Sequence, residues 1–335
     1  MDWSKGLSSK FSMVSVDPDS WGDSGNLNFS EGKIDRDAST SLRESASVVV
    51  TGDLGEQWVR IYMEASQEGS KERVALFTGI TSSPERKFKG LRNTYSTDIY
   101  SVLKPADDVV LPRGYYAQAG SGAAEVMSLL SCGPAPVEII GESPITINAI
   151  VAEDGETNLT MALAILKAIN WRLRILGDGT IQICEPASSR SELFGSNYND
   201  VVSADTAGTD SFDWYDCPNC YRAISDDGTA DARDDDPAST LSTVSRGREV
   251  WTVETNVDLS DSETIAEYAQ RALKEAQAPA RSLKYNRRFF PDLLCTDLVE
   301  LDYPVNNLTG LYKVISQSFS IDKGCEVTEE VTAYE

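Results

Sequence analysis

The sequence contains no histidine. This absence excludes Ser-His-Asp and Cys-His nucleophilic catalysis, histidine-ligated metals and the imidazole proton shuttle. The sequence also lacks an apolar run long enough to cross a bilayer, and its first residues, MDWSKGLSSKFSM, have no apolar core of signal-peptide length. We therefore expect no membrane insertion by this chain and no export signal.

Cysteine and basic residues are both scarce. The six cysteines are scattered, which is not the pattern of a secreted disulfide scaffold, so we expect reduced and mostly buried thiols. There are 30 basic against 53 acidic residues, and the net charge is −23. This charge disfavours stable binding to nucleic-acid phosphates or anionic membranes, because both are attracted by basic surfaces.

The 335 residues leave room for two or three domains. Residues 1–105 contain short runs rich in β-branched and aromatic residues, such as FSMVSV, ASVVVTG and ERVALFTGITSS. In QWVRIYMEA, alternate residues form two unlike faces, with Trp58, Arg60, Tyr62 and Glu64 on one and Val59, Ile61 and Met63 on the other. We predict a first domain over residues 1–105, built as a barrel or a strongly bent sheet.

Residues 106–190 predict an α+β domain. GSGAAEVMSLLSC indicates a helix with one apolar side, made by Ala123, Val126, Met127 and Leu130. TNLTMALAILKAIN indicates a second helix with a stripe made by Leu159, Ala162, Leu163, Leu166 and Ile169. The runs VEIIG and ITINAIV predict short strands, and Gly177-Asp178-Gly179 within WRLRILGDGTIQICEP predicts a hairpin.

Residues 191–335 predict a third domain. The strand RGREVWTVETN precedes a helix over residues 260–277, whose start has a Ser260–Glu263 capping box, and four further strand-like runs follow. A strand, a helix and antiparallel strands together predict a small barrel with a helix against it. DDGTADARDDDPAST, which falls within residues 226–240, predicts an exposed acidic loop.

Cys217 and Cys220 form a C-x-x-C pair. A thioredoxin-type site needs a helix after the pair, whereas YRAIS predicts a strand, and a four-cysteine zinc site needs a second close pair. We favour ordinary strand or turn cysteines, with a disulfide or a metal left open. The acidic loop lacks the register of a calcium-binding loop, which favours solvated side chains for Asp226, Asp227, Asp231, Asp234, Asp235 and Asp236.

Three other groups of residues are candidate catalytic or binding sites. A glycosidase-type carboxylate pair needs no histidine, but an acidic chain brings carboxylates together by chance, here Asp108, Glu153, Asp154 and Glu156. Gly120-Ser121-Gly122 lacks the lysine of a phosphate-binding loop and favours a flexible helix entry. The nearest approach to basic clusters is made by Lys5, Lys10, Arg281, Lys284, Arg287 and Arg288. The last four lie in a strand-like run, which favours a solvated strand face over contact with acidic groups of a neighbouring subunit. No catalytic, cofactor-binding or metal-binding residue is assigned, and no cofactor is expected.

The order of these pieces resembles the baseplate hub proteins of bacteriophage tails and related contractile injection systems. ERVALFTGITSS with NTYSTDIYSVL is similar to the closing strands of the family's first barrel. TNLTMALAILKAINWRLRILGDGTIQICEP is similar to its helix and returning hairpin, and STVSRGREVWTVETNVDLSDSETIAEYAQRAL with DLVELDYPVNNLTGLYKVISQSFSI to its second barrel with an inserted helix. The resemblance covers most of the chain from about residue 46 and has no catalytic signature.

The resemblance implies two tube-like β-barrels flanking a small α/β domain, and a non-enzymatic structural protein of the virion that is assembled in the host cytoplasm. It implies a homotrimeric hub between the tail tube or distal tail protein and a central spike or tail fibre protein, with a tape measure protein and passing DNA as further partners. Two other functions stay open: a carbohydrate-binding adhesin, and a cell-wall hydrolase of the tail tip that uses two carboxylates.

Overall fold

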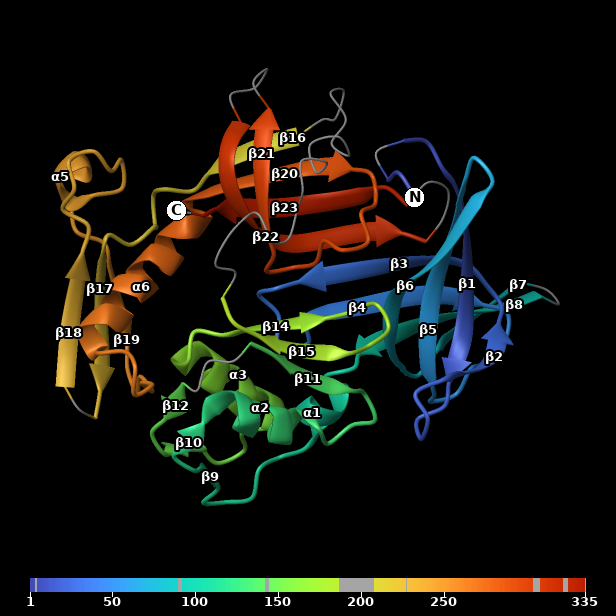
Figure 1. Cartoon of the computed structure of the whole chain (residues 1–335), viewed down its shortest axis with the longest axis horizontal. Coiled ribbons are helices and arrows are strands. Elements are labelled where there is room, and N and C mark those ends of the chain that lie inside the picture. The colour runs from blue at the N-terminus through green and yellow to red at the C-terminus, as the bar shows by residue number, and fades with distance from the viewer. Residues whose placement is uncertain are drawn as a thin grey trace.

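The computed structural model describes residues 1–3, 5–89, 92–141, 145–186, 208–226, 228–303, 308–321 and 325–334. The fold is β-rich, as predicted, and its buried apolar side chains form three clusters. One cluster fills a large sheet, the second an α+β unit below it, and the third a small sheet and helix beside both (Figure 1). The longest described helix has 13 residues, and no described helix is long and apolar enough to cross a membrane.

The large sheet has thirteen strands, paired antiparallel in the order β16-β20-β23-β22-β3-β4-β8-β6-β5-β1-β2, with β21 on β22 and β7 on β8. Eight strands come from the N-terminal part of the chain: β1 (Ser8–Val16), β2 (Asp23–Leu27), β3 (Phe29–Asp37), β4 (Glu44–Val50), β5 (Trp58–Gln67), β6 (Ser70–Thr81), β7 (Glu85–Lys89) and β8 (Arg92–Ser101). Five come from the C-terminal part: β16 (Gly208–Phe212), β20 (Arg281–Arg287), β21 (Leu298–Tyr303), β22 (Leu308–Ser320) and β23 (Val327–Ala333).

Strand β22 joins the two ends of the chain. One half of it pairs with β21, and its last residues pair with β3, where Phe319 lies opposite Ile34. Both side chains are buried in one core that also holds Phe77 and Val331. The two predicted barrels are therefore not confirmed: strands from both predicted domains join one sheet that ends at β2 and β16, and no closed barrel is found among the described strands.

The α+β unit contains the helices α1 (Lys104–Asp108), α2 (Gly122–Leu130) and α3 (Asn158–Ala168). Its strands are β9 (Tyr116–Ala117), β10 (Gly120–Ser121), β11 (Val137–Ile140), β12 (Thr146–Ile147), β13 (Ile150–Val151), β14 (Arg172–Ile175) and β15 (Ile181–Cys184). The two long helices and the β14–β15 hairpin are confirmed, and β11 adds to β15 in parallel.

The predicted helix faces are correct in part. Met127 is exposed, whereas Leu129 is buried, because α2 packs against both α3 and β11 and so buries a wider arc than one stripe. Leu163 is only partly buried, and Ile165 is fully buried. The run ITINAIV forms two separate two-residue strands.

The third unit is a small sheet with the order β18-β17-β19 and one helix packed on it. Its elements are β17 (Cys220–Ser225), β18 (Gly228–Arg233), α5 (Thr243–Arg246), β19 (Trp251–Glu254), α6 (Ile265–Gln277) and the 3-10 turn η1 (Ala278–Ala280). The prediction that RGREVWTVETN begins a barrel is wrong, because β19 pairs with β17 and not with the large sheet. Helix α6 packs through Tyr268 and Ala272 on β17 and β18.

The predicted start of the helix is also wrong. Helix α6 begins after Thr264, whose hydroxyl accepts from the Glu267 backbone N–H while the Glu267 carboxylate accepts from the Thr264 backbone N–H. The sequence contains two capping boxes of the same type, Ser260–Glu263 and Thr264–Glu267, four residues apart. It does not indicate which of the two begins the helix. Glu263, from the other box, forms an ion pair with Arg271 in the second turn.

Part of the predicted acidic loop is a strand. Residues 228–233 form β18, which pairs with β17 in a hairpin. Asp231 lies directly opposite Arg222, and its two carboxylate oxygens accept from the guanidinium at 2.6 and 2.7 Å. This cross-strand ion pair lets an acidic segment join a sheet.

Candidate functional site

Three of the four carboxylates that were candidates for hydrolysis make a contact on the surface of the α+β unit. Asp108 pairs with Lys104 in α1, and Asp154 lies 3.7 Å from Arg113. The Glu156 carboxylate accepts from the backbone N–H of Glu153 at 2.9 Å. These contacts shape surface turns.

Cys217 and Cys220 are both buried free thiols. The strand predicted after them is confirmed as β17, so no helix N-terminus lies there to favour a thiolate. Burial raises the pKa of both thiols, which keeps them protonated and unreactive at neutral pH.

Several aspartates of residues 226–236 accept hydrogen bonds from different partners and do not converge on one point. Asp234 accepts from Ser239 at 2.7 Å, Asp235 from Thr243, and Asp236 from the backbone N–H of Ala238 at 2.8 Å. Asp226 is exposed, and Asp227 lies outside the described residues. In the part of the chain that the structure describes, no three acidic or cysteine side chains gather as metal ligands would.

The turn Gly120-Ser121-Gly122 is the predicted helix entry. The Ser121 hydroxyl caps α2 by accepting from the Ala124 backbone N–H. A Cβ on Gly122 would lie 2.8 Å from a methyl carbon of Ile169, so the glycine allows α2 to approach the end of α3.

The predicted solvated strand face over residues 281–288 is correct only in part. Arg287 is buried and pairs with Glu329 at 2.6 Å within the chain, and Arg281 pairs with Asp210 of β16. Along β20 these side chains alternate between the core and the outer face, where Lys284 and Arg288 are exposed. Lys5 pairs with Asp2, and Lys10 is exposed.

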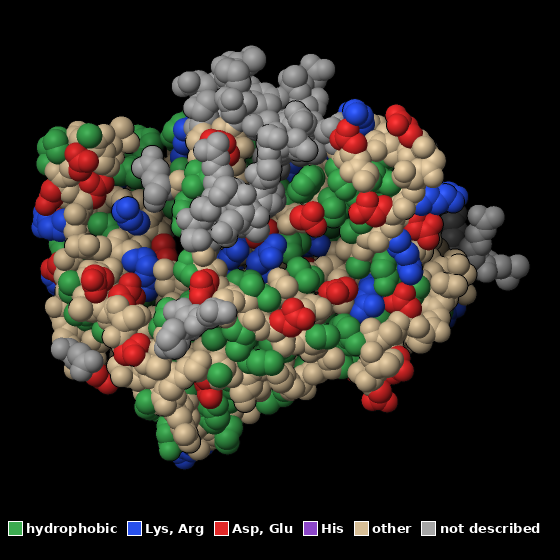
Figure 2. All heavy atoms as spheres, in the orientation of Figure 1, with side chains coloured by type: hydrophobic (Ala, Val, Ile, Leu, Met, Phe, Trp, Pro, Cys, Tyr) green, Lys and Arg blue, Asp and Glu red, His purple; other side chains and the backbone are tan. Residues whose placement is uncertain are grey.

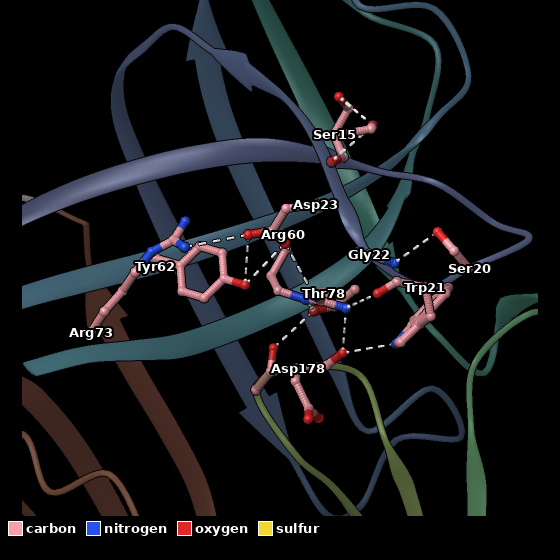
Figure 3. Close-up of polar contacts among 12 residues, drawn as sticks. Ser15, Ser20, Trp21, Gly22, Asp23, Arg60, Tyr62, Arg73, Thr78 and Asp178 are labelled. Atoms are coloured by element: carbon pink, nitrogen blue, oxygen red, sulfur yellow. Dashed lines mark hydrogen bonds and ion pairs between the residues drawn. The ribbon is translucent and has the colours of Figure 1, made fainter.

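The polar side chains that do gather lie between the packing units. We call the first group the turn junction: Trp21, Asp23, Arg60, Thr78, Gly177 and Asp178, drawn in part in Figure 3. Arg60 of β5 donates to Thr78 at 3.0 Å, to Asp23 at 3.1 Å and to the carbonyl of Asp178 at 2.9 Å. The Trp21 indole donates to the same carbonyl at 3.0 Å, and Thr78 donates to the carbonyl of Gly177 at 2.8 Å.

The turn junction fixes the β14–β15 hairpin turn on the large sheet. The alternation in β5 correctly predicts two unlike faces, but the polar face is covered here, and Arg60 is only 6% exposed. The turn carbonyls that cover it lie more than a hundred residues away in sequence. The signal in the sequence that could have indicated this contact is the position of Arg60 between the hydrophobic residues Val59 and Ile61.

The second group, the arginine junction, consists of Arg172, Arg174 and Asp297. Asp297 lies before β21 and is fully buried, and each of its carboxylate oxygens pairs with one arginine of β14, at 2.8 and 3.0 Å. Its carboxylate also accepts from the backbone N–H of Leu294. The two junctions together bind both ends of the β14–β15 hairpin to the large sheet. Figure 2 shows Lys and Arg side chains gathered in the middle of the molecule, where the large sheet meets the α+β unit.

No protein-family model matches the chain, and no curated protein sequence matches it at a significant level. Solved structures do match, and they define the class: the chain has the fold of prophage tail proteins, as the resemblance implied.

Three of the matches span nearly the whole chain. The 43 kDa tail protein of prophage MuSo2 from Shewanella oneidensis has a TM-score of 0.68 at 13% identity, over 97% of this chain and 96% of that one. The tail protein from Neisseria meningitidis MC58 has a TM-score of 0.67 at 14% identity, over 97% and 96%. Prophage tail protein gp18 from Listeria monocytogenes has a TM-score of 0.57 at 10% identity, over 96% and 94%. At identities this low the likeness is one of fold.

Proposed function

We propose that this chain is a structural protein of a phage tail tip or baseplate. The observation that carries the proposal is the match of nearly the whole chain, in a single alignment, to prophage tail proteins. The turn junction and the arginine junction also support the proposal, because they join the packing units into one rigid subunit.

In its full form the proposal is a homotrimeric hub in the virion. The hub joins the tail tube or distal tail protein to a central spike or fibre, contacts the tape measure protein, and forms part of the DNA ejection channel. Two barrel-like domains, residues 1–105 and 191–335, flank residues 106–190 in this proposal. Three copies together carry a charge of −69, three times −23, which keeps DNA from adhering to the channel wall.

Exposed apolar side chains support an assembly role. Val110, Tyr116 and Val151 are more than half exposed at the far side of the α+β unit, where Tyr116 and Val151 pair across β9 and β13. Phe212, the last residue of β16, and Trp214, just after it, are 62% and 55% exposed. Groups of large exposed apolar side chains are typical of protein contact surfaces.

The test is the mass of the purified chain by light scattering, alone and with purified tail tubes, followed by negative-stain imaging. We expect a ring of three 36.5 kDa chains with a central hole, formed alone or on the tube end. A monomer that neither assembles nor binds tail tubes would overturn the proposal.

A further inference from the structure

A small cavity lies where the large sheet, the β14–β15 hairpin and the segment before β21 meet. Its volume is about 20 Å³, enough for one particle the size of a water molecule. Arg36 and Glu44 come to it from β3 and β4, Arg43 from the turn between these strands, Arg174 from β14, and Thr296 from the segment before β21. All three parts of the fold therefore contribute to its wall.

The wall holds buried polar atoms without hydrogen-bond partners. Of ten such side-chain atoms among the described residues, five belong to this wall: Arg43 Nε, Glu44 Oε1, Arg174 Nε, Thr296 Oγ1, and Arg36 Nε, which forms an ion pair with Glu44 Oε2 at 3.5 Å. Arg36 and Glu44 are 6% and 4% exposed, so solvent at the surface does not satisfy them. Unsatisfied polar atoms are costly, and their concentration at one cavity indicates a bound partner.

The balance of donors and charge identifies the kind of partner. Arg43 Nε, Arg174 Nε and the Thr296 hydroxyl are donors without an acceptor, Arg36 Nε faces the Glu44 carboxylate, and only Glu44 offers an acceptor. A water molecule accepts about two hydrogen bonds and brings no charge, whereas a single anion accepts from all three of these donors. The wall carries three arginines against one glutamate.

The groups around the wall leave it cationic. Asp297 is shared between Arg172 and Arg174, and Glu329, further out, is paired with Arg287. The Asp37 carboxylate accepts from the Ser39 backbone and hydroxyl. Burial raises the pKa of Glu44 to about 8 and that of the Cys295 thiol to about 12, and Arg36, which pairs with Glu44 at 3.5 Å, opposes the shift of the carboxyl. Burial lowers the pKa of Arg43, and the nearby Cys295 and Asp37 oppose this shift.

The backbone at the wall is strained on two sides. Arg43 and Thr296 have φ values of 63° and 74°, in the left-handed region that non-glycine residues avoid. Such strain persists where surrounding contacts enforce it, and it is frequent at ligand sites.

We propose that this cavity binds a monatomic anion, chloride in physiological solution, held by Arg43, Arg174 and Thr296. The anion links the three parts of the fold at one point. The proposal concerns the single chain and does not depend on its assembly.

The first test is thermal unfolding at constant ionic strength, with sodium chloride replaced stepwise by sodium gluconate, whose anion is too large for the cavity. Chloride is expected to raise Tm along a saturating curve by roughly 2 °C, the size expected when a ligand reaches about ten times its dissociation constant. Thr296→Val keeps the shape of the side chain and removes one donor, and Arg43→Gln removes a charge. Both should lose most of the chloride response, whereas Arg222→Gln, on the exposed face of β17, should keep it.

The second test is direct and needs no variant. Crystals of the full chain grown or soaked in sodium bromide should show an anomalous peak in the cavity, within contact distance of the Arg43 and Arg174 guanidinium groups. A cavity that holds only water in bromide, or identical Tm values in chloride and gluconate, would overturn the proposal.

Discussion

The backbone of Gly177 passes directly against the backbone of Ala75 in β6. A Cβ at this position would lie 1.9 Å from the Ala75 carbonyl oxygen, and φ of Gly177 is not in the left-handed region, so the close approach alone requires glycine. We predict that Gly177→Ala lowers the free energy of unfolding by about 2 kcal/mol or more, because the hairpin turn must leave the sheet.

The matched control is Gly52→Ala, where an added Cβ meets nothing within 4 Å. Urea unfolding should show this control within about 0.5 kcal/mol of the parent chain. Equal effects of the two substitutions would show that the turn is not held against the sheet.

The ionisation of Glu44 also depends on contacts made in the folded chain. Burial raises its pKa from 4.5 to about 8, so the folded chain binds this proton more tightly than the unfolded chain. The resulting stability is complete below pH 4.5 and is lost as the pH rises through about 8.

Compared with Glu44→Gln, which cannot ionise, the parent chain should lose up to roughly 4 kcal/mol of stability between about pH 5 and pH 9. The measurement is urea unfolding of both proteins across this range. Because all other groups titrate in both proteins, parallel curves would contradict the raised pKa.

At the scale of elements, the β14–β15 hairpin depends on a buried carboxylate. Asp297 is fully buried between Arg172 and Arg174, so its removal leaves two guanidinium groups without their counter-charge. We predict that Asp297→Asn lowers the free energy of unfolding by about 3 kcal/mol.

An exposed ion pair with similar geometry supplies the comparison. Asp231 accepts two hydrogen bonds from Arg222 on the surface of the small sheet, where solvent screens the pair. Asp231→Asn should leave the unfolding curve nearly unchanged. If both substitutions had the same small effect, the arginine junction would not hold the hairpin.

At the scale of the whole molecule, the charge of −23 governs contact with DNA. We predict that the purified chain does not retard duplex DNA in a gel at low salt, the condition that most favours binding to phosphates. Retardation that weakens as salt is added would reveal a basic surface and contradict a channel wall that lets DNA pass.

The sequence by itself determined the elements. Periodicity located α2, α3 and the β14–β15 hairpin, and Gly177-Asp178-Gly179 located its turn, because these signals depend on neighbours within a few residues. The lack of histidine excluded histidine-dependent catalysis, the acidic charge disfavoured stable binding to nucleic acid, and the order of the pieces indicated the tail-protein fold.

Tertiary structure alone decided how the elements pair. The join of β22 to β3, the placement of β19 in a separate sheet and the choice between two capping boxes depend on contacts between distant residues. The same holds for the burial of Arg60, Glu44 and Arg287, because a charged side chain has the same local pattern whether it faces solvent or a partner from another part of the chain. The local sequence determines the hydrophobic periodicity of each helix and strand, whereas contacts between distant residues are determined only when the packing units come together.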